Sequence, residues 1–151
     1  MINLIAFLTL CFSAVMHAEE DPVAIQAMLR SLESQQSADM SDRNLGDKEA
    51  RIIASVLEKN PRVIALDLSM NNIGDEASAL LGEALVTNAT LQSLDLSDNP
   101  QIGIKSAQAF LKALDTNKTL RTLKLKNTKI SGSILNNINK LLIRNKLLLG
   151  R

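Results

Sequence analysis

Acidic and small polar residues recur at a fixed interval in this chain. Three aspartates stand 28 residues apart, and a lysine follows 29 residues after the last of them: Asp39, Asp67, Asp95 and Lys124. Two residues after each comes a second series: Ser41, Ser69, Ser97 and Lys126. Carboxylates gathered at one place attract a cation, or a lysine or arginine of a partner protein. Whether they gather depends on the elements that carry them.

Other kinds of chemistry have few residues to use. The chain has one cysteine, Cys11, and one histidine, His17. Both lie in the N-terminal stretch "MINLIAFLTLCFSAVMHAEED", which is apolar from residue 2 to 16 and turns acidic at Glu19. An apolar run of about 7–15 residues followed by a small residue is typical of a secretory signal peptide. We predict a signal peptide at residues 1–18, with an uncleaved membrane anchor and a folded helix as alternatives.

Loss of this peptide would leave the mature chain without cysteine or histidine. The mature chain would then have no thiol nucleophile, no imidazole base and no Cys/His zinc site. The remaining carboxylate, hydroxyl and amine side chains show no arrangement typical of a catalytic site. We expect no enzyme activity, no metal and no cofactor. The expected localisation is secreted or periplasmic, or membrane-anchored if the peptide stays on the chain.

The chain repeats itself. Three segments align with one another, residues 63–90, 91–119 and 120–147, with lengths of 28, 29 and 28 residues. A partial copy precedes them at 39–62, and a truncated copy follows. In each copy, a half such as "LQSLDLS" alternates apolar and polar residues, which predicts a strand, and a half such as "AQAFLKAL" has the spacing of an amphipathic helix. One strand and one helix cannot bury both apolar faces alone, so the copies must stack.

The strand half carries the pattern L-x-x-L-x-L-x-x-N. It is formed by Leu91, Leu94, Leu96 and Asn99, and again by Val63, Leu66, Leu68 and Asn71. This pattern resembles the leucine-rich repeat, and the 28-residue period resembles its ribonuclease-inhibitor-type subfamily, with likeness to NOD-like-receptor and bacterial variants. The resemblance covers residues 39–151. It implies an α/β fold, a short right-handed βα solenoid with parallel strands on the concave side and helices on the convex side.

The two ends of the array depart from the pattern. Residues 19–38 are predicted to form a capping helix and a linker, because Ile25, Met28, Leu29 and Leu32 make one apolar stripe. In the family, the repeat asparagine bonds backbone amides of neighbouring turns, and Thr128 stands at that place in the third full repeat. We therefore expect the array to loosen toward its C-terminal end. No second cap is expected there, which would leave a strand edge open for pairing.

The outward strand positions form a candidate binding surface. We assign to it Asp39, Asp67, Ser69, Asp95, Ser97, Lys124 and Lys126. In one interpretation, the aspartates repel one another and dock lysine or arginine of a partner. In the other, they are solvated residues of an ordinary repeat strand. No aromatic residue stands among them, although strong binding sites favour such anchors.

Charge divides the chain into two parts. From Glu19 to Asp115 it has 16 acidic and 8 basic residues, and from Thr116 to Arg151 it has nine basic and no acidic ones. The basic end comprises Lys118, Arg121, Lys129, Lys140, Arg144 and Lys146. Such an end can bind an acidic protein or an anionic membrane, associate head to tail with another copy, or protect an exposed strand edge. Nucleic acid is the weakest partner, because no aromatic residues are interleaved to stack on bases.

Two Asn-x-Thr sequences match the glycosylation signal, at Asn88 and Asn117. They occupy the same place in successive repeats, where the family's own consensus supplies Asn-x-Thr-Leu, so a structural role is the alternative. Taken together, the sequence predicts a non-catalytic, secreted protein–protein interaction module that uses its concave face or its basic end. The alternatives are a self-associating structural repeat and a binder of an anionic surface.

Overall fold

The computed structural model describes residues 22–59 and 62–148, except for the side chains of residues 22–25, 28 and 31. The predicted signal peptide at 1–18, with Cys11 and His17, lies outside the described residues, as does Arg151. The elements alternate in the order α2 (Pro22–Ser34), β1 (Ser37–Asp39), α3 (Asp47–Leu57), β2 (Ala65–Asp67), α4 (Asp75–Thr87), β3 (Ser93–Asp95), α5 (Ile104–Thr116), β4 (Thr122–Lys124) and α6 (Gly132–Leu147). β1 begins two residues before the predicted start of the partial repeat at residue 39.

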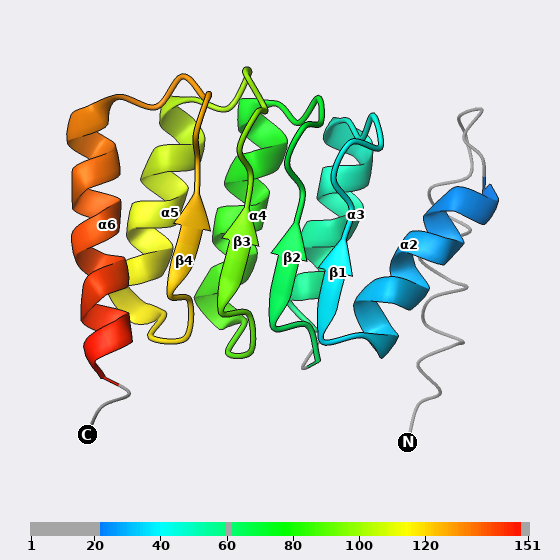
Figure 1. Cartoon of the computed structure of the whole chain (residues 1–151), viewed down its shortest axis with the longest axis horizontal. Coiled ribbons are helices and arrows are strands. Elements are labelled where there is room, and N and C mark those ends of the chain that lie inside the picture. The colour runs from blue at the N-terminus through cyan, green and yellow to red at the C-terminus, as the bar shows by residue number, and fades with distance from the viewer. Residues whose placement is uncertain (1–21, 60–61, 149–151) are drawn as a thin grey trace.

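The four strands form one parallel sheet in the order β1-β2-β3-β4. Figure 1 shows this sheet in front of α3, α4 and α5, with α2 and α6 at the two ends. The central residue of each strand points inward and is buried, and these residues are Ala38, Leu66, Leu94 and Leu123. The predicted α/β fold, with parallel strands on one side and helices on the other, is confirmed.

The core between the sheet and the helices is aliphatic. Each helix buries the small and branched residues of one stripe, such as Leu81 and Leu85 in α4. Phe110 in α5 is the one large aromatic residue of the described core. The helical spacing of these residues turns them toward the strands, and the alternating leucines of the strands complete the same core.

Helices α4 and α5 are each capped at the N-terminus by an aspartate of the repeat before them. The residues at the N-caps of α4 and α5 are Gly74 and Gly103, which have no side chain to offer. Asp47 accepts a hydrogen bond from the Gly74 amide at 2.6 Å. Asp75 likewise accepts hydrogen bonds from the amides of Gly103 and Ser106, both at 2.9 Å. A negative charge at a helix N-terminus is favourable, so these aspartates join neighbouring repeats.

Buried asparagines form a second set of links at the carboxyl ends of the strands. Asn99 donates to the carbonyls of Leu68, Leu96 and Ser97, and its own carbonyl accepts from the Ile73 amide at 3.0 Å. Asn71 makes the corresponding bonds one repeat earlier. Thr128 makes a single bond of this kind, to the Leu125 carbonyl at 2.8 Å. The expected difference between these asparagines and Thr128 is confirmed.

The N-terminal end of the array is covered by α2. This helix contacts α3 and β1. Of the predicted apolar stripe, Leu29 and Leu32 are buried, whereas the side chains of Ile25 and Met28 lie outside the described set. Among the described residues, no helix has both the length and the hydropathy that crossing a bilayer requires.

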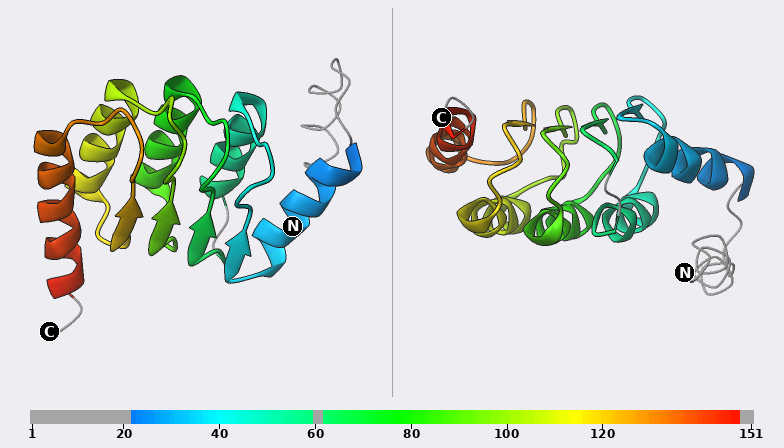
Figure 2. Two further views of the ribbon diagram at one scale, coloured as in Figure 1. Left: turned by 45° about the horizontal axis from the view of Figure 1, so that its top comes forward. Right: turned by 90° about the horizontal axis from the view of Figure 1, so that it is seen from below.

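The C-terminal end differs from the sequence expectation. We expected no cap there, but α6 leaves the row of α3–α5 and lies toward the strand layer at the end of the array, as the right panel of Figure 2 shows. It buries Ile138, Leu142 and Asn145. Asn145 donates to the carbonyls of Asn117 at 3.0 Å and Leu120 at 2.7 Å. The end of the core is therefore covered, although β4 has no strand on its outer side among the described residues.

Candidate functional site

The outward strand residues form continuous columns on the concave face. The register pairs Asp39 with Asp67, Asp67 with Asp95, and Asp95 with Lys124. Neighbouring strands lie about 4.8 Å apart, so the four side chains are consecutive neighbours. The structure thus brings together the residues that the sequence placed in this column. Their role in binding stays a prediction.

Each aspartate is held by the serine two residues after it. Asp39 Oδ1 accepts from the Ser41 amide at 3.0 Å and from its hydroxyl at 2.7 Å. Asp67 Oδ1 accepts from the Ser69 amide at 2.9 Å and from its hydroxyl at 2.6 Å. This local turn satisfies one oxygen of each carboxylate. The Asp-x-Ser sequence therefore has a structural role at the ends of β1, β2 and β3, in addition to any role in binding.

Asp95 differs because a lysine neutralises it. Its Oδ1 accepts from the Ser97 amide at 3.0 Å, and its Oδ2 accepts from Lys124 Nζ at 2.8 Å. Burial tends to raise the pKa of the Asp95 carboxyl, but the hydrogen bonds from Lys124 and Ser97 outweigh it and hold the pKa below its usual range. The same bond to Asp95 raises the pKa of Lys124. Both groups are charged at neutral pH.

The first aspartate of the column is the most accessible. The hydrogen bonds from the Ser41 hydroxyl and amide lower the pKa of Asp39, whose side chain is exposed. Asp67 is half-buried, and Lys126 on the far side of the sheet is exposed. The concave face therefore presents carboxylates toward β1 and a cation beyond β4, separated by a floor of serines.

The basic end is less uniform than its sequence predicts. The Arg144 guanidinium is half-buried and donates to the Leu114 carbonyl, so it fastens α6 to the end of α5 and is not a free surface cation. Arg121 Nη1 donates to Gln92 Oε1 at 2.9 Å, and Lys118 Nζ donates to the Asp115 carbonyl at 2.6 Å. Exposed cations of this end include Lys129, Lys140 and Lys146.

Sequence and structure comparisons agree with this geometry. The family model described as "Leucine Rich repeat" matches residues 59–78 and 87–111. These two segments are leucine-rich repeats, and the other strand–helix units of the described chain continue the same fold. The ribonuclease-inhibitor-type subfamily stays a prediction. A search of curated proteins found no match.

Two solved structures share the fold of these leucine-rich repeats. One is titled "Leiomodin-1 Actin-Binding Site 2 (ABS2)", with 23% identity, a TM-score of 0.72, and coverage of 86% of this chain and 76% of that one. The other is the tropomodulin C-terminal domain of Caenorhabditis elegans, with 12% identity, a TM-score of 0.67, and coverage of 84% of this chain and 93% of that one. At these identities the likeness concerns the fold. A leucine-rich-repeat fold suggests a protein-interaction module.

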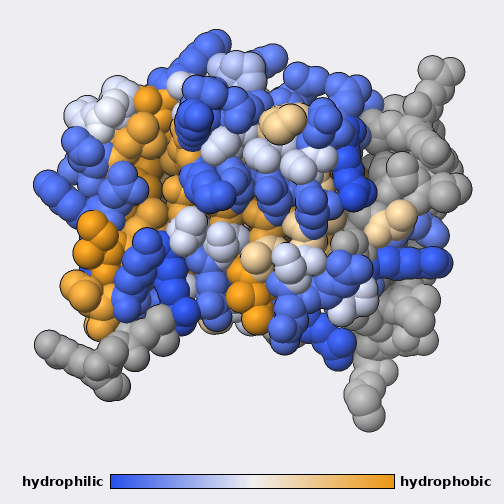
Figure 3. Space-filling model, viewed as in Figure 1, coloured by the Kyte–Doolittle hydropathy of each residue, from blue (hydrophilic) through white to orange (hydrophobic). Residues whose placement is uncertain are grey.

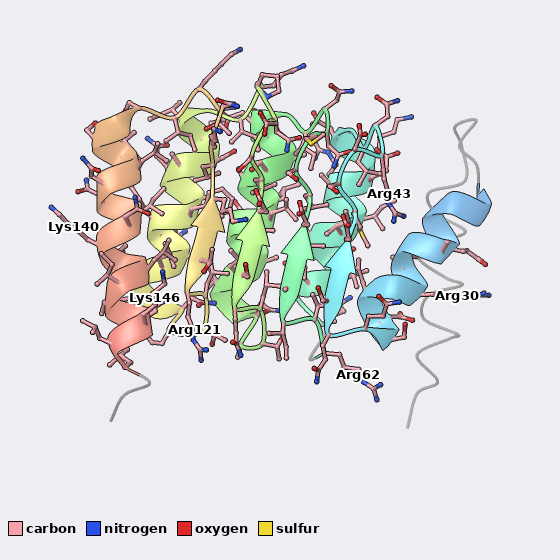
Figure 4. The ribbon with its side chains drawn as sticks, in the orientation of Figure 1. Arg30, Arg43, Arg62, Arg121, Lys140 and Lys146 are labelled. Carbon is pink, nitrogen blue, oxygen red and sulfur yellow. The ribbon has the colours of Figure 1, made fainter. Side chains whose placement is uncertain are left out.

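Charge is unevenly spread along the leucine-rich repeats. Residues 22–62 contain six acidic and six basic residues, whereas 63–115 contain seven acidic and two basic ones. The acidic excess of the described chain therefore lies in the middle repeats, and its N-terminal part is balanced. In Figure 4, Arg30, Arg43 and Arg62 lie in this N-terminal part, while Arg121, Lys140 and Lys146 lie at the opposite end.

Both Asn-x-Thr asparagines have structural roles in the leucine-rich repeats. Asn88 Nδ2 donates to the Leu57 carbonyl at 2.6 Å, and Asn117 Nδ2 donates to the carbonyls of Leu85 at 2.7 Å and Asn88 at 2.8 Å. Both residues are buried. Asn145 continues the series without a following threonine. The nitrogen that would carry a glycan is therefore engaged in the folded chain.

Sequence reasoning missed the capping aspartates of the leucine-rich repeats. Burial tends to raise the pKa of Asp75, but hydrogen bonds from the Ser106 hydroxyl and from the amides of Ser106, Gly103 and Lys105 hold it below its usual range. A usable signal was present, because a Gly-Asp pair recurs at Gly46-Asp47 and Gly74-Asp75. Within the described residues, no cluster of side chains suited to a metal ion is found.

Proposed function

We propose that this chain is a non-catalytic protein-binding module that holds an extended partner segment across its concave face. The observation that carries the proposal is the change of sign across the two neighbouring columns of outward side chains, from carboxylates near β1 to lysine at β4. Asp39 and Asp67 stand at one side of the sheet, and Lys126 stands beyond the other. The serines between them are short, so a partner backbone can approach the sheet closely.

The spacing of these charges defines the partner segment. Three strand intervals of about 4.8 Å separate β1 from β4, a span of about 14 Å. An extended chain covers this span with about four residues, at roughly 3.3 Å per residue. The expected segment therefore carries a carboxylate over Lys126 and a lysine or arginine either about four residues away over Asp39 or about three residues away over Asp67. Lys124 contributes less, because Asp95 already holds it at 2.8 Å.

The expected affinity is moderate. Exposed ion pairs contribute about 0–1 kcal/mol each, and strong interfaces rely on buried aromatic or arginine anchors. The concave columns contain no aromatic residue. We expect a dissociation constant in the micromolar range, with a strong dependence on salt.

Photo-crosslinking from the two faces tests this proposal. A photoreactive amino acid is placed at Ser69 on the concave face. As a matched control, it is placed at Gln108, an exposed residue of α5. The expected result is a crosslinked partner from position 69 and not from 108, which is lost when Asp67→Lys reverses the concave charge. Equal crosslinking from both positions, or a partner indifferent to Asp67→Lys, would refute concave binding.

Actin is the first named partner to test. The leiomodin-1 structure carries an actin-binding site in its title, and its fold resembles 86% of this chain. Cosedimentation with actin filaments should be compared for the unaltered chain and Asp67→Lys. If neither sediments with the filaments, actin is excluded, and the crosslinking experiment decides the concave proposal alone.

Secretion to the exterior or the periplasm is proposed from the N-terminal sequence. If residues 1–18 are removed on export, the mature protein begins at Glu19, and the N-terminus of the exported protein measured by mass spectrometry should show it. An intact N-terminus in the membrane fraction would support an anchor instead.

Self-association is the second candidate. It draws on the acidic excess of residues 63–115 and the basic end. A head-to-tail contact would bring the basic end against residues 19–62, which carry nine acidic and six basic residues. Light scattering at low and high salt tests it, and a monomer at low salt would exclude it.

A further inference from the structure

The second half of α6 has an exposed hydrophobic face. Ile143 is 54% exposed, Leu147 is 70% exposed and the adjoining Leu148 is 51% exposed. Ile143 and Leu147 stand one helical turn apart, so they lie on the same face. Figure 3 shows hydrophobic surface over the lower part of α6, on the left of the view. Contiguous apolar surface of this kind is uncommon on a monomer and often marks a contact site.

Basic side chains flank this face. Lys140 precedes Ile143 by three residues and Lys146 follows it by three, and both are exposed. Figure 4 shows Lys140 directed away from the array and Lys146 directed toward the side of β4. No acidic residue occurs between Thr116 and the end of the chain. We call Lys140, Ile143, Lys146, Leu147 and Leu148 the α6 patch.

The α6 patch sits on a fixed part of the helix. The opposite face of the same turns is fastened to the array by Arg144, which donates to the Leu114 carbonyl, and by Asn145, which is buried. Asn145 bonds the Asn117 carbonyl at 3.0 Å, which brings the loop that carries Lys118 next to this end of α6. The apolar side chains are therefore held in place with cations on their borders, the arrangement of an interface core and its rim.

We propose that the α6 patch docks a short amphipathic segment of a partner protein, in which two large apolar side chains are flanked by aspartate or glutamate. The proposal rests on the proposed protein-binding function and adds a second contact surface to the concave face. The apolar side chains of the segment cover Ile143, Leu147 and Leu148. Its carboxylates pair with Lys140 and Lys146, and this charge complementarity identifies the class of segment.

A second copy of the chain fits the α6 patch less well. Two patches placed face to face would bring lysines against lysines, because a two-fold contact uses the same surface twice. The other large hydrophobic residues that are well exposed in the described chain are Met70, Val86 and Ile104. They lie in three different segments and offer no matching apolar surface.

An anionic membrane also fits less well. The first half of α6 exposes uncharged polar residues, Asn136, Asn137 and Asn139. A helix lying flat on a membrane would press these amides against the lipid, and interfacial helices carry cations along their polar face instead. The basic and apolar residues occupy only the second half, about two turns, which suits a short segment.

The test uses defined peptide probes with the folded chain. The first probe is a labelled helical peptide of about 14 residues, with leucines on one face and glutamates elsewhere. The second is the same peptide with lysines in place of the glutamates. Binding is followed by fluorescence anisotropy for Ile143→Ser/Leu147→Ser and Lys140→Glu/Lys146→Glu. Ile104→Ser is the control for the apolar variant, because Ile104 is 54% exposed like Ile143. Lys112→Glu is the control for the charge variant, because Lys112 is an exposed lysine of α5.

The acidic probe is expected to bind the unaltered chain at the α6 patch, and the lysine probe is not expected to bind there. The apolar double variant should weaken binding about tenfold and the charge variant about fivefold, whereas the controls stay within about twofold. Asp67→Lys should leave probe binding unchanged, so that failure of concave binding and failure of this proposal are distinguishable. Circular dichroism checks that each variant keeps its helices.

Three outcomes would overturn the proposal. One is no binding of the acidic probe, or binding that the apolar double variant does not weaken. Another is concentration-dependent oligomers in sedimentation that Ile143→Ser/Leu147→Ser abolishes, which would assign the patch to a second copy. The third is cosedimentation with phosphatidylserine vesicles, lost in the same variant, without peptide binding, which would assign it to a membrane.

Discussion

The α4–α5 contact and the α5–α6 contact are built from the same repeat but differ in their lateral links. At α4–α5, Gly82 allows close approach, since a Cβ at this position would lie 2.8 Å from the Ala109 Cβ. Asp75 caps α5 across the same contact. The two helices can therefore pack closely and in parallel register, with five of the 13 residues of α5 buried.

At α5–α6 three of these links are changed. Leu111 stands at the repeat position of Gly82, and Ile104 stands at the position of Asp75. Thr128 replaces the asparagine that Asn99 supplies one repeat earlier. Only three of the 16 residues of α6 are buried. The asparagine that follows the helix in the earlier repeats, as Asn88 and Asn117, is kept as Asn145. Its hydrogen bonds hold the second half of α6 to the array, although α6 does not continue the row of α3, α4 and α5.

This difference shows that a few side chains hold each repeat in line with the next. The core positions are filled by apolar residues in every repeat, including the last, and these residues do not by themselves align the helices. At the α5–α6 contact, the capping aspartate, the small residue and the asparagine at the carboxyl end of the strand are all replaced. The helix there closes the end of the array and has one exposed face. Substitutions in each contact test how much these side chains contribute.

The largest effect is expected at the asparagine. Asn99→Ala leaves the Ile73 amide and three carbonyls without this partner, and unsatisfied buried groups are costly, so unfolding free energy should fall by about 3–4 kcal/mol. Thr128→Ala loses one hydrogen bond and should cost about 1 kcal/mol. Urea denaturation of both variants measures the difference. Equal losses of unfolding free energy in the two variants would show that Asn99 does not distinguish the α4–α5 contact from the α5–α6 contact.

A slightly smaller loss is expected from crowding α4 and α5. Gly82→Leu introduces a side chain where even a Cβ would meet Ala109 at 2.8 Å, and overpacking should lower the unfolding free energy by about 2–3 kcal/mol. The reverse change in the neighbouring contact, Leu111→Ala, removes a half-buried side chain and should cost about 1 kcal/mol. If Gly82→Leu is tolerated in thermal unfolding, close approach is not what aligns the helices.

The contribution of the Asp75 cap to the free energy of unfolding should depend on pH. Asp75→Ala removes the carboxylate at the start of α5 and should cost about 1–2 kcal/mol at pH 7. Because the folded-state pKa of Asp75 is lowered, its contribution is present above the unfolded pKa of about 4 and is lost as the pH falls through the folded value. Urea denaturation from pH 7 to pH 3 should therefore bring the variant and the unaltered chain together in acid. A constant difference would contradict the cap.

The smallest effect is a gain at the C-terminal contact. Ile104→Asp places a carboxylate at the repeat position of Asp75, which caps the helix of the next repeat. A cap there should add about 0.5–1 kcal/mol and slow hydrogen exchange in the first turn of α6. Ile104→Asn provides the control without charge. Unchanged exchange would mean that α6 lies too far from this position to be capped.

Much of the fold could be predicted from the sequence. The register followed from the 28-residue interval, because one column of aspartates fixes which strand residues are neighbours. The difference between Asn99 and Thr128 followed from their side chains. The displacement of α6 could not be predicted in this way, since its buried residues Ile138 and Leu142 continue the repeat pattern, and the links that position it come from other repeats.

The candidate site was predicted less completely. The concave column was placed correctly, but its hydrogen bonds were not foreseen, because Asp-x-Ser is equally consistent with free carboxylates. Arg144 was counted as a surface cation, although its repeat position next to Asn145 turns it inward. The exposure of Ile143 and Leu147 depends on the displacement of α6, and a helical wheel alone gives no signal for it.

The burial of the two Asn-x-Thr asparagines makes attachment of a sugar a question of timing. In a cell that glycosylates this signal, the enzyme can reach Asn88 and Asn117 only before the neighbouring repeats close over them. A chain that folds quickly would escape modification. A chain that folds slowly would carry a glycan at Asn88 or Asn117, and the glycan would keep the neighbouring repeats from packing together. The fraction of chains that carry no glycan would then report how quickly the chain folds relative to the glycosylating enzyme.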